Sequence, residues 1–441
     1  MKESVDYGKA TRINLFDFKS TPMRAFHFAW FSFFLCFFGW FGIAPLMPIV
    51  REELNLTQSQ IGNIIISSVA ITIFSRLIIG YLVDKFGPRI TYSVLLIFGS
   101  LPVMSIGLSN SYESFLLFRL AIGAIGASFV ITQFHTSIMF APNVVGTANA
   151  TSAGWGNLGG GVTQIVMPLI FTAIIALGFT EGQAWRYAMV FPGVALFIMG
   201  FLYYRYTKDT PSGNFASYKK TKNEKKSQVQ ILSVIKDVRV WVLFLIYGAC
   251  FGVELTLNNI AAIYFTDTFG LNLKTAGIIA GLFGMMNLFA RTLGGFFGDK
   301  AGIKFGLKGR VLFLGLVLLL EGIALLVFAK MTLLPLAIIT LIVFSLFVQM
   351  SEGATFSVVP FINKKAIGTV SGIIGAGGNV GAVAAGFLFK SMSYNEGLYV
   401  LGFVVIAISA SVLLIKFSST SETEAKIELE KPEEVLEPVL V

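Results

Sequence analysis

Charged residues are scarce in this sequence and make up only 13% of its 441 positions. A soluble domain carries about 25% charged residues, so too few charges remain to cover a water-soluble globule of this size. Hydrophobic residues account for 55% of the chain and occur in blocks such as 26–50 and 311–329. About 20 apolar residues suffice for a helix that crosses the hydrocarbon of a bilayer. The blocks therefore predict membrane-spanning segments.

Alternation of apolar and polar residues with period two is absent, which excludes a transmembrane barrel and leaves helices. The chain has two cysteines, Cys36 and Cys250, and two histidines. Their spacing forms neither a disulfide framework nor a metal site, and no nucleophile–base pair or nucleotide-binding loop occurs. We therefore expect no cofactor, no metal and no enzymatic activity. We also expect no cleavable signal peptide before Phe26, because no apolar segment with a small-residue cleavage site precedes it. The net charge of +9 is explained by membrane topology rather than by nucleic-acid binding.

Twelve apolar segments predict an all-α membrane protein with twelve transmembrane helices. The polar, lysine-rich linker 207–238 divides them into two six-helix halves, 26–206 and 239–416. A segment of residues 1–25 precedes the first half, and an acidic, solvated tail of residues 417–441 follows the second. The predicted spans are 26–50, 58–83, 89–108, 112–140, 145–178, 185–206, 239–266, 274–298, 310–329, 334–361, 366–391 and 395–416.

The distribution of lysine and arginine predicts how the chain is oriented in the membrane. Three of the 33 basic residues fall within spans, and most of the others lie on the side that holds both termini and the linker. Loops rich in lysine and arginine remain in the cytoplasm. Both termini are therefore predicted to be cytoplasmic, with the protein in the plasma membrane or, in a bacterium, the inner membrane. The opposite side receives Arg51, Arg186, Lys274, Lys330 and Lys390.

A short motif occurs once in each half. The pattern Gly-x-x-x-Asp-Lys-x-Gly ends the second span and again the eighth, and it predicts a tight turn whose charges pair between the halves. The motif resembles the cytoplasmic loop motif of the major facilitator superfamily, whose members have two similar six-helix halves that rock about a central site. The resemblance implies the major facilitator fold. The charged residues of the motif are Asp84, Lys85 and Arg89 in the first copy and Asp299 and Lys300 in the second.

Two arginines occupy equivalent positions within the spans. Arg76 and Arg291 each lie eight residues before the aspartate of the motif, which places them about 12 Å along the helix from that end. A charge at such a depth costs on the order of 2.5–3.5 kcal/mol. One interpretation is a structural arginine paired with an acid on a neighbouring helix, such as Glu254. The other is a central pocket in which two guanidinium forks bind a planar anion with several oxygens.

Spans five and eleven are rich in glycine, and each contains an asparagine whose amide donors suit an oxyanion, Asn157 and Asn379. Each glycine costs up to about 1 kcal/mol in a helix relative to alanine. Close helix packing, flexing during transport and close approach to the substrate remain as explanations. The glycines are Gly154, Gly156, Gly159, Gly160, Gly161, Gly375, Gly377, Gly378 and Gly381.

These paired stretches resemble the nitrate signatures of the nitrate/nitrite porter family. The similarity extends from about residue 26 to 416, through Phe74–Leu77, Tyr247–Thr256, Asn287–Arg291 and Val359–Phe361, and it leans toward plant and algal high-affinity carriers. It implies that two arginines, a tyrosine and two asparagines bind the substrate between two aromatic rings. The corresponding residues are Arg76, Arg291, Tyr247, Asn157, Asn379, Phe129 and Phe251.

The resemblance implies a carrier of nitrate, with nitrite as a second substrate, that works by alternating access. We expect a functional monomer. Proton-coupled symport is favoured because acids lie within the spans, while nitrate/nitrite antiport stays open. The candidates for proton transfer are Glu254, Glu321, Glu352 and His135, although ion pairing with the arginines or simple packing also explains these residues.

Two other functions remain to be separated from this one. A carrier of organic anions or organophosphates would also use paired arginines, but in a roomier pocket with more basic groups. A non-transporting nitrate sensor would add a soluble domain, and segments 207–238 and 417–441 are too short to form one.

Overall fold

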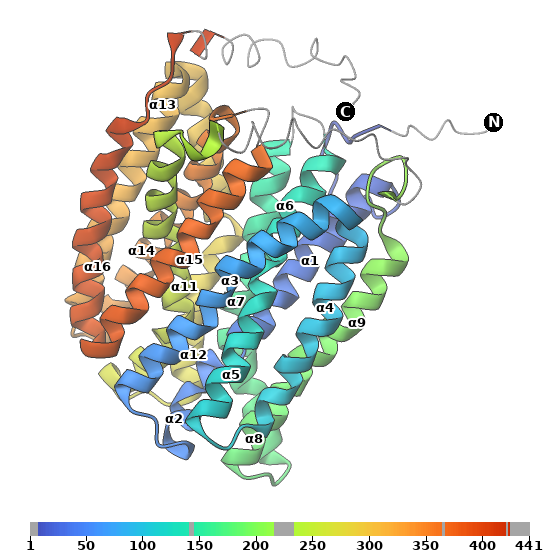
Figure 1. Cartoon of the computed structure of the whole chain (residues 1–441). Helices are drawn as coiled ribbons and strands as arrows, with labels where there is room; N and C mark the ends of the chain where they lie inside the picture. Colours follow the sequence, from blue (N-terminus) through green and yellow to red (C-terminus); the bar gives the residue numbers. More distant parts are fainter. Residues whose placement is uncertain (1–7, 141–144, 216–232, 364–366, 420–421, 424–441) are drawn as a thin grey trace.

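The computed structural model of the chain describes residues 8–140, 145–215, 233–363, 367–419 and 422–423. Its helices form an elongated bundle in which most of them run along the long axis (Figure 1). The end of α9 and the beginning of α11 lie at the same end of this bundle, the upper end in Figure 1. Most of the predicted linker, residues 216–232, and most of the tail, residues 424–441, lie outside the described residues.

The first half of the chain supplies six spans. Short 3₁₀ turns interrupt or extend some of them, as at η1 and η3. The helices are α1 (Thr21–Phe41), η1 (Ala44–Leu46), α2 (Met47–Glu53), α3 (Gln58–Phe86), α4 (Pro88–Ser105), η2 (Ile106–Leu108), α5 (Tyr112–Gly123), η3 (Ala124–Ala127), α6 (Ser128–Met139), α7 (Val145–Ala176), α8 (Glu181–Ala188) and α9 (Val190–Tyr206).

The second half repeats this arrangement. Its helices are α11 (Val238–Phe269), α12 (Leu273–Met285), η5 (Met286–Leu288), α13 (Ala290–Ala329), α14 (Leu334–Val358), η6 (Val359–Phe361), α15 (Ile367–Ser391), α16 (Tyr394–Ser409) and η7 (Ala410–Leu414). Within α13 the backbone turns at Gly306, which has φ +69° and ψ −164°. Glycine adopts this positive φ without strain. The turn divides α13 into two helical segments, of which the first completes the eighth span, which begins at Leu273, and the second belongs to the ninth.

The prediction of twelve spans is confirmed, because twelve helices in the described part of the chain are long and apolar enough to cross a membrane. The helices exceed the apolar blocks at several ends. The first span runs over Thr21–Glu53 rather than 26–50, whereas the second, Gln58–Val83, has the predicted bounds. Hydropathy detects only the part of a helix that crosses hydrocarbon, whereas the hydrogen-bonded backbone continues until a cap or a turn ends it.

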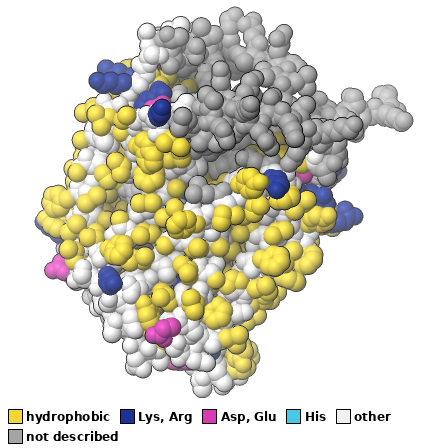
Figure 2. All heavy atoms as spheres, in the orientation of Figure 1, with side chains coloured by type: hydrophobic (Ala, Val, Ile, Leu, Met, Phe, Trp, Pro, Cys, Tyr) yellow, Lys and Arg dark blue, Asp and Glu magenta, His cyan; other side chains and the backbone are white. Residues whose placement is uncertain are grey.

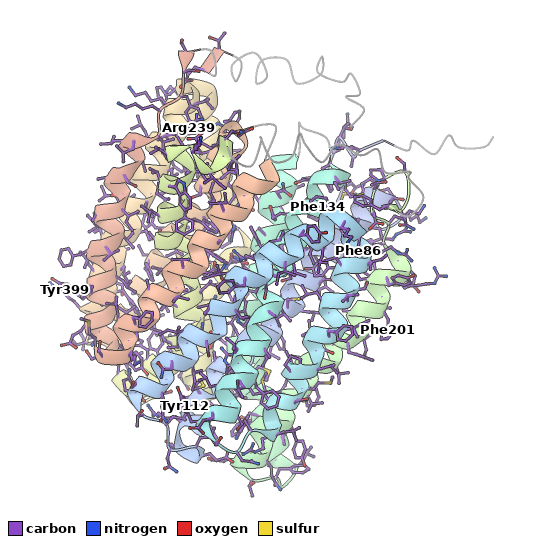
Figure 3. The ribbon with its side chains drawn as sticks, viewed as in Figure 1. Phe86, Tyr112, Phe134, Phe201, Arg239 and Tyr399 are labelled. Atoms are coloured by element: carbon purple, nitrogen blue, oxygen red, sulfur yellow. The ribbon has the colours of Figure 1, made fainter. Side chains whose placement is uncertain are left out.

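Several helices that begin at the lower end of the bundle in Figure 1 have side-chain caps. Thr57, Ser111, Thr180 and Ser393 each accept a hydrogen bond from the backbone N–H three residues later and form capping boxes. Such a cap satisfies a donor that the first helical turn leaves free. Tyr112, directly after one of these caps, lies at the lower end of the bundle, and Arg239, near the start of α11, lies at the opposite end (Figure 3).

Helices from the two halves pack along the length of the bundle. Within the halves α1 packs on α7 and α11 on α15, while α3 contacts α15 and α7 contacts α12 between them. A polar contact also joins the halves, since Arg119 Nη2 donates to Asn259 Oδ1 at 3.0 Å. Hydrophobic side chains cover the middle of the visible face, and charged ones gather toward its ends (Figure 2). This distribution fits a bundle surrounded by lipid.

Glycine allows α11 and α15 to approach each other closely. A Cβ at Gly381 would collide with the backbone carbonyl of Gly248, whereas Gly372 on the same helix has open space around it. We expect Gly381→Ala to destabilise the protein by about 1–3 kcal/mol through overpacking. Gly372→Ala should leave stability unchanged or raise it slightly, because alanine is the better helix former. Thermal unfolding of the purified variants in detergent measures both, and equal midpoints would contradict the packing role.

Candidate functional site

Arg76 lies inside the bundle on α3 and is 3% exposed. Its Nη1 donates to the backbone carbonyl of Gly375 on α15, so the contact joins the two halves. The orientation of the Asn379 amide that satisfies both groups places its oxygen 2.8 Å from Nη1 and 3.3 Å from Nε. Nη2 has no hydrogen-bond partner among the described residues. The guanidinium of Arg76 therefore keeps its positive charge and a free donor in a buried place.

Arg291 lies in the first turn of α13 and is 1% exposed. Its Nη1 forms an ion pair with Glu352 on α14, and its Nη2 donates to Tyr247 Oη on α11 at 2.8 Å. Arg76 and Arg291 are close enough for each charge to act on the other. The two arginines therefore lie near each other, and their joint binding of one anion stays a prediction. They differ in that one is neutralised by a carboxylate, and this carboxylate is Glu352 rather than Glu254.

Aromatic rings fill the space beside the arginines. The Arg76 guanidinium carbon lies 5.2 Å from the ring centre of Phe129 on α6 and 5.6 Å from that of Phe251 on α11. These two rings face each other with centres 6.5 Å apart and planes 30° from parallel. Tyr247 stacks on Phe251 at 5.0 Å. We call Arg76, Arg291, Tyr247, Phe129, Phe251 and Asn379 the central site.

Phe356 completes the aromatic wall and was not singled out in the sequence. Its ring meets that of Phe129 edge-on at 5.9 Å and that of Tyr247 at 5.2 Å. Phe356 lies four residues after Glu352 on α14, and two residues four apart share one face of a helix. The position of Glu352 therefore contained the signal that this ring points toward the same region.

Asn157 on α7 lies apart from its expected partner in the anion site. Its Nδ2 donates to Glu254 Oε2 on α11 at 3.1 Å, and Asn287 Nδ2 donates to Glu254 Oε1 at 2.7 Å. The equivalent asparagine, Asn379, faces Arg76 instead. The two halves therefore use equivalent asparagines differently. Asn287 belongs to this network, although only its place in the family-like stretch Asn287–Arg291 drew attention to it.

Glu254 and Glu352 form a carboxyl pair. Both are fully buried, and their carboxyl groups lie within hydrogen-bonding reach of each other. Both oxygens of Glu254 accept from amides, one oxygen of Glu352 binds Arg291, and the other has no partner among the described residues. Glu352 Oε1 is therefore open to a further hydrogen bond.

Comparison with known proteins decides the family. The model of the Major Facilitator Superfamily matches residues 29–386. The chain is 43% identical to the high affinity nitrate transporter 2.5 of Arabidopsis thaliana, over 93% of this chain and 82% of the relative. It is 30% identical to the nitrate/nitrite transporter NrtP of Picosynechococcus sp., over 82% and 83% of the two chains. The chain belongs to the nitrate/nitrite porter family of the major facilitator superfamily.

The fold of this porter is also that of solved facilitators. A bacterial homologue of the human lysosomal transporter Spinster, solved in an inward-facing and unoccupied conformation, superposes with a TM-score of 0.66. The two proteins are 14% identical, and the match covers 93% of the porter and 98% of the other chain. At this identity the likeness shows the fold alone. The predicted fold class and the resemblance to plant and algal carriers are both confirmed.

The glycines of α7 and α15 lie in tight contacts in the porter. A Cβ at Gly156 would enter the ring of Phe33 on α1, and a Cβ at Gly161 would collide with the backbone of Gly284 on α12. Gly378 lies in the same way against Phe251. Close packing therefore accounts for these glycines, and their role in flexing stays a prediction. At each of the remaining glycines, an added Cβ would have a neighbouring atom within 4 Å. These glycines are Gly154, Gly159, Gly160, Gly375, Gly377 and Gly381.

His135 lies away from the central site, near the end of α6. Its Nδ1 is 2.6 Å from Tyr203 Oη, and its Nε2 is 2.8 Å from the backbone carbonyl of Lys208. A carbonyl oxygen only accepts, so Nε2 carries a proton and, in the neutral ring, Nδ1 accepts from Tyr203. Both ring nitrogens are thus engaged in joining α6 to the end of α9. This arrangement favours a structural role over proton transfer.

An acid that the sequence analysis did not single out stabilises the loop motif of the first half by a hydrogen bond. Asp209, directly after α9, accepts from the backbone N–H of Arg89 at 2.8 Å, and the Arg89 guanidinium lies 4.0 Å above the ring of Tyr204. Burial raises the pKa of Asp209, and hydrogen bonds from backbone N–H groups oppose that rise. Lys85 lies over the rings of Tyr81 and Phe86, and Lys300 over that of Phe296. The side chains of Asp84 and Asp299 lie outside the described part of the structure.

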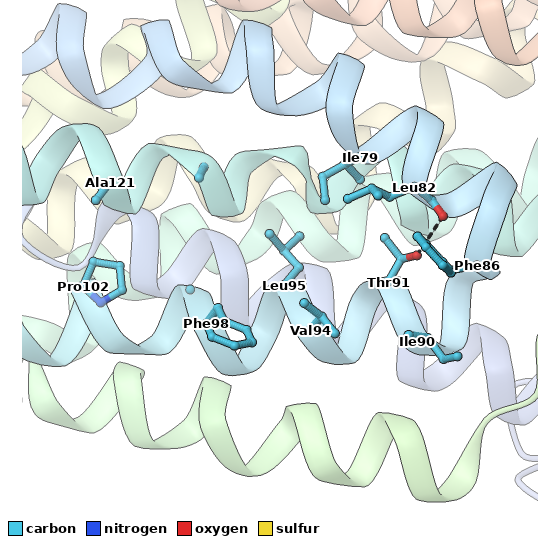
Figure 4. Close-up of a pocket in the computed structure, with 12 residues that line it drawn as sticks. Ile79, Leu82, Phe86, Ile90, Thr91, Val94, Leu95, Phe98, Pro102 and Ala121 are labelled. Atoms are coloured by element: carbon cyan, nitrogen blue, oxygen red, sulfur yellow. Dashed lines mark hydrogen bonds between the residues drawn. The ribbon is translucent and has the colours of Figure 1, made fainter.

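An apolar groove of about 660 Å³ lies apart from the central site (Figure 4). It runs between α3, α4 and the α5–η3 segment and contains no charged side chain. An anion needs positive or donor groups, so this groove has no part in anion binding. Its lining is Ile79, Leu82, Phe86, Ile90, Thr91, Val94, Leu95, Phe98, Gly99, Pro102, Ala121 and Ala124.

Proposed function

We propose that this porter carries nitrate across the membrane, with nitrite as a second substrate, and that the central site binds the anion. The observation that carries the proposal is a buried Arg76 whose hydrogen-bond partners are neutral groups, next to Arg291, which a carboxylate neutralises. An unpaired buried charge is costly, and an anion supplies the missing partner. The names of the relatives in Arabidopsis and Picosynechococcus support nitrate and nitrite as that anion.

The shape of the central site supports a small planar anion. Phe129 and Phe251 are 6.5 Å apart and close to parallel, and carbon atoms in contact are about 3.5–4.0 Å apart. A flat group between the rings needs two such contacts, about 7–8 Å, so the rings must move apart slightly to admit a group one atom thick. The guanidinium fork of Arg76 lies beside both rings and can hold the edge of that group. A carrier of larger organic anions needs more room. Competition of labelled nitrate uptake by phosphate and by carboxylates tests this alternative, and inhibition as strong as that by nitrite would favour it.

Transport is proposed to proceed by alternating access, with Arg51 and Asp267 closing one side. The two side chains come from different halves, α2 and α11, and bind at 2.7 and 3.0 Å. They lie at the end opposite to the linker, which the positive-inside rule assigns to the outside. The pair must break before the central site opens to that side. The same rule supports cytoplasmic termini in the plasma membrane or, in a bacterium, the inner membrane.

Breaking this ion pair is expected to shift the porter toward the outward-open state. Each side chain is about a quarter exposed, so the loss is on the order of 1 kcal/mol or less. We expect Arg51→Ala to enlarge the outward-open population up to about fivefold. Spin labels at the exposed positions Glu52 and Ser391, on opposite halves, report the change as a larger fraction of molecules with a long distance between the two labels. The charge-swapped double variant Arg51→Asp with Asp267→Arg is the control and should restore the original distances. An unchanged distance distribution in Arg51→Ala would contradict the role of this ion pair in closing the outer side.

Proton-coupled symport is the proposed mode of energy coupling. The carboxyl pair lies against Arg291, so the charge on the pair and the charge of the bound anion interact directly. Binding of nitrate adds a negative charge, which favours protonation of the pair. A proton and an anion then cross together. Antiport of nitrate and nitrite remains the second candidate, because an unpaired Arg76 favours reorientation only when an anion is bound.

Uptake into liposomes containing the purified porter separates the two modes. Labelled nitrate is offered at an acid outside pH, with and without nitrite inside. Symport predicts accumulation that follows the pH gradient and needs no internal nitrite. Uptake that requires internal nitrite and ignores the gradient would establish antiport instead. A functional monomer predicts that activity does not change with the number of porters per liposome.

A further inference from the structure

Glu321 is a buried acid that the mechanism above does not use. It lies on the second part of α13, after the turn at Gly306, and is fully buried. Neither of its oxygens has a hydrogen-bond partner among the described residues. The carboxyl pair, in contrast, is bound to amides and to Arg291. Glu321 therefore lacks the contacts that explain the other two acids.

The surroundings of Glu321 contain acids but no cation among the groups that act on it. From α14, the Ser351 hydroxyl lies next to the carboxyl, and Glu352 interacts with it electrostatically. From α11, the Cys250 thiol also interacts with the Glu321 carboxyl electrostatically. On the side of α16, the neighbouring Gly322 packs on the backbone of Gly402 and on Ile406, which carry no charge.

These surroundings favour a carboxyl that holds a proton. An ionised carboxylate without a partner in a buried apolar environment is strongly disfavoured, and the neutral acid has the lower free energy. Ionisable residues within membrane spans commonly mark ion pathways and proton relays. Ser351 directly precedes Glu352 in the chain, and its Oγ and Glu352 Oε1 are both without partners among the described residues. A hydroxyl can both accept and donate a proton.

We propose that Glu321 is a proton-binding site that exchanges its proton with the carboxyl pair through Ser351. This inference deepens the proposed symport and rests on it. A proton from the outer aqueous phase forms an O–H bond at Glu321. That bond breaks as the Ser351 hydroxyl accepts the proton and releases its own to Glu352 Oε1, from which it leaves to the cytoplasm. No electrons are transferred, and one proton enters for each one released.

The test uses the full-length porter in liposomes and the variant Glu321→Gln, which resembles the protonated acid but binds no proton. We expect nitrate accumulation driven by a pH gradient to fall at least about tenfold in this variant. Exchange of labelled for unlabelled nitrate at equal pH should stay within about twofold of wild type, because Glu321 lies outside the central site. Glu113→Gln, an exposed acid on α5, is the matched control and should accumulate nitrate like wild type.

A second variant and a second readout guard against failure to fold. Ser351→Ala should slow gradient-driven uptake while exchange continues. In infrared difference spectra of the wild type, nitrate should change a carbonyl band of a protonated carboxylic acid, and Glu321→Gln should lose this band. Gradient-driven uptake at the wild-type rate in Glu321→Gln, or an unchanged band, would overturn the inference and leave nitrate transport intact. A wild type that exchanges nitrate but ignores the gradient would overturn both this inference and symport, and a wild type that carries no nitrate would overturn the proposed function itself.

Discussion

Lysine in place of Arg76 should abolish most nitrate transport while leaving the protein folded. Lysine keeps the positive charge but loses the planar fork, whose Nη1 contacts both Gly375 and Asn379 and whose Nε also contacts Asn379. Hydrogen bonds to charged groups contribute about 1.5–3 kcal/mol each. The loss of one such bond to the anion predicts an apparent affinity for nitrate lower by roughly 10–100-fold. The ammonium is also more strongly hydrated than guanidinium, which disfavours its place between Phe129 and Phe251.

The measurement is the initial rate of labelled nitrate uptake at several nitrate concentrations, in liposomes with equal amounts of protein. Arg205→Lys, at an exposed arginine near the end of α9, is the matched control and should behave like wild type. A thermal midpoint close to that of wild type shows that Arg76→Lys is folded. Transport near the wild-type rate in Arg76→Lys would count against direct binding of the anion by this residue.

Glutamine in place of Glu352 should make the porter unstable and dependent on nitrate. The substitution leaves Arg291 without its negative partner, and removing one member of a buried ion pair costs about 3–5 kcal/mol. Nitrate, which brings a negative charge to the same region, should restore part of this loss. A ligand that binds only the folded state stabilises it in proportion to the logarithm of its concentration. Tighter binding of nitrate, slower turnover and loss of the response to a pH gradient are expected together.

Thermal unfolding in detergent, with and without nitrate, measures this effect. Glu352→Gln should unfold at a lower temperature than wild type, and nitrate should raise its midpoint more than it raises that of wild type. Sulfate at equal ionic strength controls for screening by salt. The exposed Glu113→Gln serves again as the control variant. An unfolding temperature that equals that of wild type and ignores nitrate would show that Arg291 does not need the carboxylate.

Much of the fold was predictable because hydropathy and charge act locally along the chain. An apolar block long enough to cross hydrocarbon must become a helix in lipid, so twelve blocks predict twelve spans. The duplicated motif placed Arg76 and Arg291 at equivalent positions before any contact was known. Hydropathy also separates the eighth span from the ninth, but it does not locate the turn at Gly306 between the two helical segments of α13.

The partners of the buried polar groups were not predictable. Ion pairing of Glu254 or Glu352 with an arginine was one interpretation of the sequence, but it left open that Arg291 binds Glu352. Asn157 binds Glu254 rather than the anion site. These pairs come from helices far apart in the chain, and their choice depends on how the helices are rotated and on which side chains meet. Periodicity within one helix gives the face of each residue but not the helix that this face meets. Asp209 was missed for a related reason, since its partner at Arg89 is a backbone N–H.

The most direct test of the central claim is binding of isotope-labelled nitrate to the purified porter, measured beside the double variant Arg76→Lys with Arg291→Lys. The two guanidinium groups and the rings between them predict saturable binding by the wild type, displaced by nitrite and not by phosphate, and loss of that binding in the double variant. Equal binding of nitrate by both proteins would contradict the account, because the anion would then be held elsewhere.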